Sequence, residues 1–141
     1  MNGNWPRLGV CLALGIVLIS GCGSDGPFEY VPVQGKVTFE DGAVIPASGI
    51  SLQFDAIDVK PVGDMVPRVA KAQVDGEGVF TCATSHKYGD GLIPGKHKVA
   101  LLYATDAAGK LLIPKDYTSL ATTPLIVETG EGTLEVKVPR P

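Results

Sequence analysis

An alternation of apolar and polar residues that begins at Val31 constrains the fold more than any other feature of this sequence. Apolar residues or glycine occupy one parity, and mostly polar residues occupy the other. The apolar parity consists of Val31, Val33, Gly35, Val37 and Phe39. Because successive side chains of a β-strand point to opposite faces, a period of two predicts a half-buried strand of an antiparallel sheet.

The same period recurs along the chain and predicts an all-β fold. Further strands are expected over residues 50–56, 68–74, 79–84, 96–104, 124–129 and 133–138. No amphipathic helix pattern occurs in residues 22–141. Many short alternating strands separated by glycine and proline turns are typical of two packed sheets. We therefore predict a single domain, a seven-stranded antiparallel β-sandwich.

Glycine, proline and acidic residues mark the connections between these strands. Residues 57–67 and 85–95 contain prolines and glycines without a period and are predicted to be long loops. Residues 75–78 and 130–132 are predicted to close hairpins, because their glycines allow positive φ angles. The acidic residues of the first turn lack the spacing and the number of oxygens of an EF-hand calcium site. In the strand after it we expect Phe80 and Cys82 to point inward.

The first 22 residues carry a different pattern. Residues 8–19 are apolar and uncharged, and they are followed by the small residues Ser20 and Gly21 and by Cys22. The apolar run is shorter than the ~20 residues that a membrane-spanning helix needs, but it suits the core of a secretion signal. Cys22 could be an ordinary residue after an ordinary signal peptide.

The end of this run resembles the cleavage site of bacterial lipoproteins. The resemblance implies a signal peptide over residues 1–21, which is cleaved between Gly21 and Cys22. It also implies a diacylglycerol on the Cys22 thiol. Lipoproteins of this kind usually carry a further acyl chain, such as palmitate, on the new amino terminus. These acyl chains together would anchor the protein far more firmly than one chain alone. Gly23 after the cysteine resembles the choice that sorts lipoproteins to an outer membrane.

The predicted mature protein has a short tether and an acidic charge. Residues 22–30 form the lipidated cysteine and a flexible tether, and residues 31–141 the sandwich domain. A tether of this length has a typical span of about 16 Å, so the domain should stay close to the bilayer. The whole chain has a net charge of −3, and removal of Arg7 with the leader makes it −4. This balance argues against nucleic acid as a partner.

Cysteine and histidine give no pattern typical of catalysis or metal binding. Once Cys22 is acylated, Cys82 is the one cysteine left in residues 22–141, so no internal disulfide is expected. A lone cysteine on a strand usually acts as a small buried hydrophobic residue. Neither His86 nor His97 is accompanied by a second ligand at a metal-site spacing. We expect no metal, no cofactor and no catalytic residue.

Four segments, in this order, are similar to a carboxypeptidase-regulatory-like domain. They read VQGKVT at 33–38, DGEGVF at 75–80, LIPGKHKV at 92–99 and IPKDY at 113–117. The resemblance implies a prealbumin-like (transthyretin-like) Greek-key sandwich, usually a non-catalytic module. His97 departs from it, because the family usually has tyrosine there. We expect His97 to be half-buried, with the aromatic packing role and a polar tip.

These observations favour a lipid-anchored, non-enzymatic cell-envelope protein whose sandwich binds an unknown envelope protein or glycan near the membrane, or has a structural role. One alternative is a module for carbohydrate or peptidoglycan, with Tyr88 and Tyr117 as stacking residues, although each could instead cap the core. Another is strand addition by a partner peptide at an open sheet edge. A transthyretin-like hydrolase of hydroxyisourate is disfavoured, because that group ends in Tyr-Arg-Gly-Ser and this chain in Val-Pro-Arg-Pro. Ser85 beside His86 does not form a triad.

Overall fold

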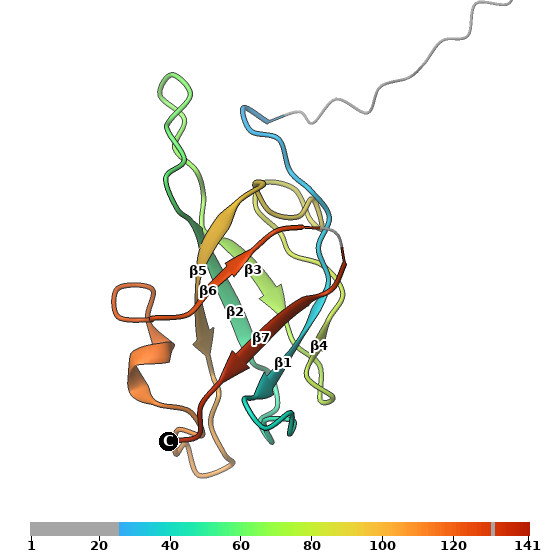
Figure 1. Ribbon diagram of the computed structural model, residues 1–141, viewed down its shortest axis with the longest axis vertical. Coiled ribbons are helices and arrows are strands. Elements are labelled where there is room, and N and C mark those ends of the chain that lie inside the picture. The colour runs from blue at the N-terminus through green and yellow to red at the C-terminus, as the bar shows by residue number, and fades with distance from the viewer. Residues whose placement is uncertain (1–25, 131) are drawn as a thin grey trace, which may run out of the picture.

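The computed structural model describes residues 26–130 and 132–141, and over these residues the chain is almost entirely strand and loop (Figure 1). The strands are β1 (Gly35–Phe39), β2 (Ser51–Ala56), β3 (Ala70–Gln73), β4 (Val79–Phe80), β5 (Lys96–Leu102), β6 (Ile126–Glu128) and β7 (Leu134–Val138). A short 3₁₀ helix, η1 (Lys115–Thr118), lies between β5 and β6. The predicted all-β class is confirmed. Within the described ranges, no helix has the length and apolar character needed to cross a bilayer.

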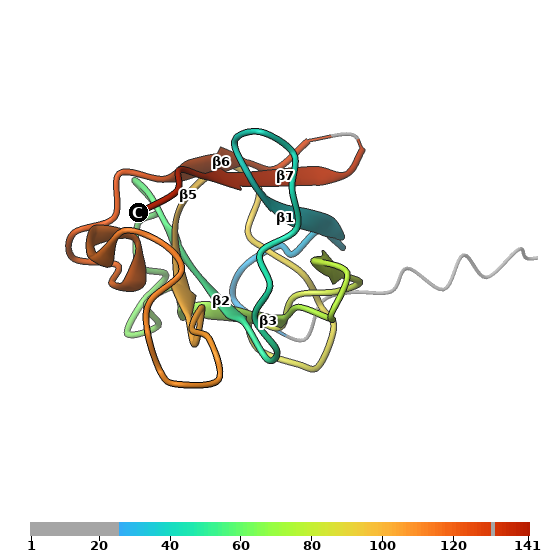
Figure 2. The same cartoon turned by 90° about the horizontal axis from the view of Figure 1, so that it is seen from below.

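In the part of the chain that is described, the strands form a three-stranded sheet of order β4-β1-β7 and a four-stranded sheet of order β3-β2-β5-β6. Viewed along the long axis, β2 and β3 lie opposite β1 and β7 (Figure 2). The chain changes sheet between β1 and β2, between β3 and β4, between β4 and β5 and between β6 and β7. Within the four-stranded sheet every pairing is antiparallel.

One pairing contradicts the predicted antiparallel arrangement. Strands β1 and β7 run parallel, with Gly35 opposite Leu134 and Phe39 opposite Val138. They are the first and last strands described, so no short turn joins them and their relative direction is not set by a hairpin. Alternation reports which face of a strand is buried, and it carries no information about the direction of the neighbouring strand.

The two predicted hairpins are also corrected. The turn at residues 75–78 forms, but β3 and β4, on either side of it, belong to different sheets. Similarly, β6 and β7 lie on either side of residues 130–132 and belong to different sheets. Thr129 N–H donates to the Gly95 carbonyl just before β5, whereas Leu134 N–H donates to the Gln34 carbonyl just before β1. Each connection therefore crosses the edge of the sandwich.

The apolar parities meet between the two sheets and form one core. Phe54 of β2 and Phe80 of β4 face each other from opposite sheets, with their ring centroids 6.1 Å apart. Gly35 of β1 lies opposite Phe80 on β4 and against its ring, where a Cβ atom would come within 2.4 Å of Phe80 Cζ. The predicted inward positions of β7, Leu134, Val136 and Val138, are buried as expected.

Strand β5 is shorter than predicted, and its histidine is more deeply buried. The prediction extended to residue 104, but Tyr103 has a φ of +62°, which ends the strand at Leu102 and leaves the tyrosine side chain 69% exposed. His97 was expected to be half-buried and is only 2% exposed. Strand β5 lies between β2 and β6, and β6 pairs with its first three residues, Lys96–Lys98.

Candidate functional site

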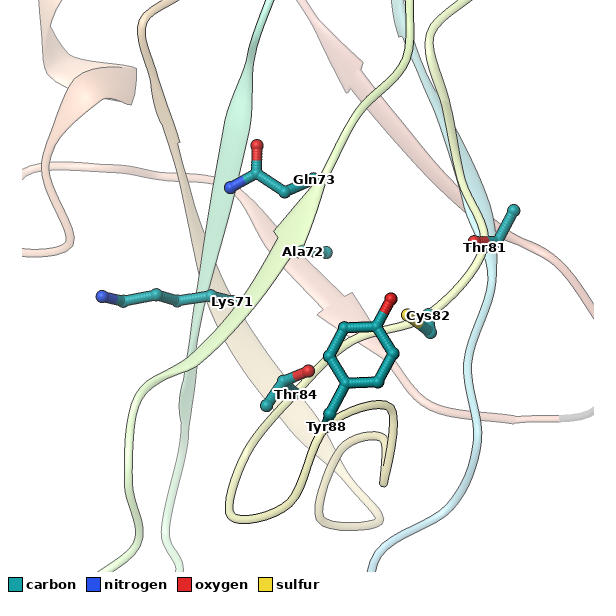
Figure 3. A pocket seen from close by; sticks show the side chains of 7 residues that line it. All are labelled: Lys71, Ala72, Gln73, Thr81, Cys82, Thr84 and Tyr88. Carbon is teal, nitrogen blue, oxygen red and sulfur yellow. The ribbon is translucent and has the colours of Figure 1, made fainter.

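A pocket of about 200 Å³ opens between the edges of the two sheets. It is lined by Lys71, Ala72, Gln73, Thr81, Cys82, Thr84 and Tyr88. Figure 3 shows the Tyr88 ring in front of Cys82 and Thr84, while the amino group of Lys71 extends away from that ring. Two wider hollows, of about 340 and 440 Å³, are lined about half by glycine, alanine and proline, and their polar side chains are Gln34 and Thr81 in the first and Ser48, Thr105 and Asp106 in the second.

The pocket exists because two neighbouring segments meet at both ends and separate between them. At one end Asp75 N–H donates to the Val79 carbonyl across the turn. At the other end Lys71 and Thr84 exchange two backbone hydrogen bonds, of 3.0 and 2.8 Å. Between these points β3 pairs with β2, and β4 pairs with β1 in the opposite sheet. The gap that results is the pocket.

The loop over residues 85–91 is held in one shape by the carboxylate of Asp90. Its oxygens accept hydrogen bonds from the backbone N–H groups of Ser85 (2.7 Å), His86 (2.9 Å) and Lys87 (2.8 Å). Burial of this carboxyl acts to raise its pKa, but the backbone hydrogen bonds from Lys87, Ser85 and His86 outweigh it, and the pKa of Asp90 lies below its ordinary value. Because the carboxylate holds the backbone, the loop presents its tip in a defined position.

The tip of this loop carries Tyr88, which is 91% exposed. The other tyrosine proposed for stacking, Tyr117, lies in η1 and packs partly buried against the core. The two lie toward opposite ends of the molecule: the loop with Tyr88 is near the N-terminal segment, and η1 is near the C-terminus (Figure 1). The structure therefore does not bring them together. Tyr117 has the capping role, and Tyr88 does not.

Cys82 is half-buried in the wall of the pocket and is not part of the core. The expectation that its side chain points inward is therefore wrong. Phe80 is fully buried, as predicted. The alternation ends there because β4 is only two residues long. Among the described residues Cys82 is a free cysteine. Gly89 of the 85–91 loop lies close to it, since a Cβ atom there would be 3.9 Å from Cys82 Cβ.

The histidines occupy unrelated environments. His97 Nε2–H donates to the Ile93 carbonyl (2.7 Å), and its ring lies edge-on to Phe54. Its Nδ1 is buried and has no hydrogen-bond partner among the described residues. His86 is in the surface loop, and the hydroxyl of the adjacent Ser85 donates to the Gly91 carbonyl instead (2.6 Å). Over residues 26–130 and 132–141, no three His, Cys, Asp or Glu side chains gather in a way that could hold a metal ion.

Sequence reasoning missed this pocket and could not place the predicted lipidation site in the structure. Gly21 and Cys22 lie outside the described residues. Lys71 and Gln73 were recognisable only as the polar parity of a strand, which is the pattern of an ordinary solvated face.

Comparisons with protein-family models, with curated proteins and with solved structures found no match to this chain.

Proposed function

We propose that this chain is a lipid-anchored, non-enzymatic cell-envelope lipoprotein whose β-sandwich is a binding or structural module. The observation that carries the proposal is the uncharged apolar run over residues 8–19 followed by Ser20-Gly21-Cys22. Acylated Cys22 would hold the protein in the membrane, and Gly23 favours the outer membrane as its location. The described body is compatible with this reading, because Phe28, six residues after Cys22, is already buried in a body whose strands form two sheets.

Replacement of Cys22 by serine tests the anchor directly. We expect Cys22→Ser to move the protein from the membrane fraction to the soluble fraction, and mass spectrometry of the wild-type protein to show an acylated cysteine at its amino terminus. The matched control is Cys82→Ser, which removes a thiol far along the chain and should leave the protein with the membrane. A Cys22→Ser protein that stays membrane-bound would overturn the proposal.

The prealbumin-like Greek-key topology is part of the same proposal. Its support is the division of the strands into two facing sheets and the four places at which the chain passes from one sheet to the other. Connections of this kind are typical of Greek-key sandwiches, in which sequential strands do not simply form a meander. An experimental structure would test it: a different strand order in either sheet would contradict it.

A second candidate function, binding of a glycan such as peptidoglycan, is favoured by one observation. Tyr88 is 91% exposed on a loop whose shape is fixed by Asp90, and it borders the pocket. An apolar ring face of this kind suits stacking on a sugar. At about 200 Å³ the pocket is smaller than the roughly 300–1,000 Å³ of sites for drug-sized ligands, so it would take a single sugar ring or substituent.

Tyr88→Ala and its matched control Tyr103→Ala distinguish stacking from a general loss of tyrosine. Tyr103 is also exposed, but it lies beyond the far end of β5. If Tyr88 stacks on a sugar, Tyr88→Ala should weaken binding of peptidoglycan fragments about three- to tenfold, which corresponds to about 0.5–1.5 kcal/mol. Tyr103→Ala should leave that binding unchanged. Equal effects of the two substitutions would rule out Tyr88 as the stacking residue.

A turnover assay tests the non-enzymatic part of the proposal. The hydrolase alternative needs histidines that act together, and here His97 is buried while His86 lies in a surface loop. We expect no hydrolysis of hydroxyisourate above the spontaneous rate. Hydrolysis that is lost in a His86→Ala variant would contradict this expectation.

A further inference from the structure

The segment between β2 and β3, which contains the predicted loop 57–67, projects from the sandwich and carries a group of exposed hydrophobic side chains. This segment, residues 57–69, is called the finger below. Of the eight large hydrophobic side chains that are exposed in the described part of the chain, four lie in the finger. They are Val62 (52% exposed), Met65 (44%), Val66 (64%) and Val69 (38%). Scattered single residues of this kind are ordinary, but a cluster on one projection is typical of an interaction site.

The finger has a defined backbone. Val62 and Met65 exchange two backbone hydrogen bonds, of 2.9 and 3.0 Å, across a tight turn in which Gly63 has a φ of +60°. Asp58, with a φ of +59°, redirects the chain at the base of the finger. Pro61 and Pro67 lie on either side of the turn. Less chain entropy is lost when such a preformed turn binds, so its apolar tip can contact another surface at a small entropic cost.

The finger and the N-terminal segment leave the body at the same end. Ala56, the last residue of β2, pairs with His97 near the start of β5. Val31 pairs through two hydrogen bonds with Leu92, which lies just before β5. Figure 1 shows the finger and the N-terminal segment together at one end of the long axis, with the C-terminus at the other.

The proposed anchor limits how far this end can be from the membrane. Phe28 is already buried in the folded body, six residues after Cys22. Six residues span at most about 22 Å even when fully extended. An acylated Cys22 therefore keeps Phe28 within that distance of the bilayer surface, and the finger projects from the same end of the body.

We propose that the finger inserts its apolar tip into the headgroup region of the bilayer that holds Cys22, and so fixes the orientation of the sandwich on the membrane. This inference rests on the proposed lipid anchor. Val62, Met65 and Val66 supply the apolar contact. The carboxylate of Asp64, between two of them, restricts the tip to the interface, because a charged group and turn backbone are costly to place in the hydrocarbon core. Elements that lie in the interface bury their apolar side about 5–10 Å deep.

A tryptophan placed at the tip tests this contact. The only tryptophan of the chain is Trp5, in the predicted leader, so in the processed protein Val66→Trp introduces a single reporter. The acylated protein is reconstituted in vesicles of phosphatidylethanolamine and phosphatidylglycerol whose acyl chains are brominated near the headgroup. We expect the emission of the V66W protein to shift to the blue and to be strongly quenched. Tyr103→Trp, at the other end of β5, is the matched control and should be neither shifted nor quenched.

Amide hydrogen exchange on the unsubstituted protein checks that the introduced tryptophan does not itself drive insertion. Vesicles should slow exchange at residues 60–68 and leave the 105–111 turn unchanged. If the protein sediments with the vesicles but the V66W tryptophan stays exposed to water and the finger exchanges at its free rate, the finger proposal is overturned and the anchor stands. If the protein does not sediment and Cys22 is unacylated, the anchor fails and the finger proposal fails with it.

Discussion

Gly35 is required because the backbone of β1 is approached from two sides. A Cβ atom at this position would lie 2.3 Å from the Leu134 carbonyl oxygen and 2.4 Å from Phe80 Cζ. Neither neighbour is the free end of a flexible side chain, since one is the backbone of β7 and the other a buried ring. We expect Gly35→Ala to lower the free energy of unfolding by about 1–3 kcal/mol through overpacking, measured by urea denaturation.

Gly76→Ala is the matched control for that substitution. A Cβ atom at Gly76 has nothing within 4 Å, and its φ is not positive. Alanine there should leave stability unchanged or raise it by about 0.4–1 kcal/mol, because it reduces the entropy of the unfolded chain. Equal losses for the two substitutions would contradict the role assigned to the contact with Phe80.

A second residue, Asp90, gives the protein a stability term that depends on pH. Its pKa is held below the ordinary aspartate value, so the folded state favours the ionised form. The stabilisation is fully present above the unfolded pKa of about 3.9 and is lost as the pH falls through the lower folded pKa. We expect Asp90→Asn to destabilise the protein at pH 7 and the difference from wild type to shrink below about pH 4. A difference that stays constant down to pH 2.5, in thermal melts, would contradict this account.

At the scale of elements, the same five-residue turn occurs twice. Asp75 and Asp106 each accept, through Oδ1, the N–H groups two and four residues on, at 2.9 Å. In both turns the fourth residue is a glycine with a positive φ, Gly78 at +82° and Gly109 at +83°. The first turn leads directly into the buried Phe80, whereas the second ends at a single bridge between Thr105 and Leu111.

This difference predicts unequal effects of equal substitutions. Loss of a side chain that caps backbone N–H groups in this way costs about 1 kcal/mol. We expect Asp75→Ala to cost at least that much, because the turn positions Phe80 in the core, and Asp106→Ala to cost less. Urea denaturation of both variants measures the two values. A larger loss for Asp106→Ala would show that the first turn does not position the core.

The elements also show what the sequence can and cannot predict. A period of two placed the strands approximately and gave the buried parity of β7, because burial of one face is a local property of each strand, although only Val79–Phe80 of the predicted strand 79–84 forms β4. The parallel pairing of β1 with β7 is set by contacts between residues nearly a hundred positions apart, which no local pattern reports. The pocket arises from the separation of two segments after a correctly predicted turn, so it depends on which sheet each segment joins. A turn sequence does not contain that information.

At the scale of the whole molecule, one end combines the N-terminal segment, the loop with Tyr88 and the finger, and the other end combines η1 and the C-terminus (Figure 1). If Cys22 is acylated, this polarity places the finger and the loop with Tyr88 on the membrane side. The pocket and Tyr88 would then face ligands at or near the bilayer surface, and the finger would set their height above it.

A longer tether separates the contribution of the finger from that of the anchor. Inserting about twenty Gly and Ser residues between Gly23 and Ser24 lengthens the typical span of the tether from about 16 Å to about 30 Å. The acylated protein should still sediment with vesicles, because the anchor is unchanged. Quenching of the V66W tryptophan should fall, since a longer tether lowers the effective concentration of the finger at the bilayer. Undiminished quenching would show that the intrinsic affinity of the finger for lipid is enough to hold it at the membrane, without the short tether.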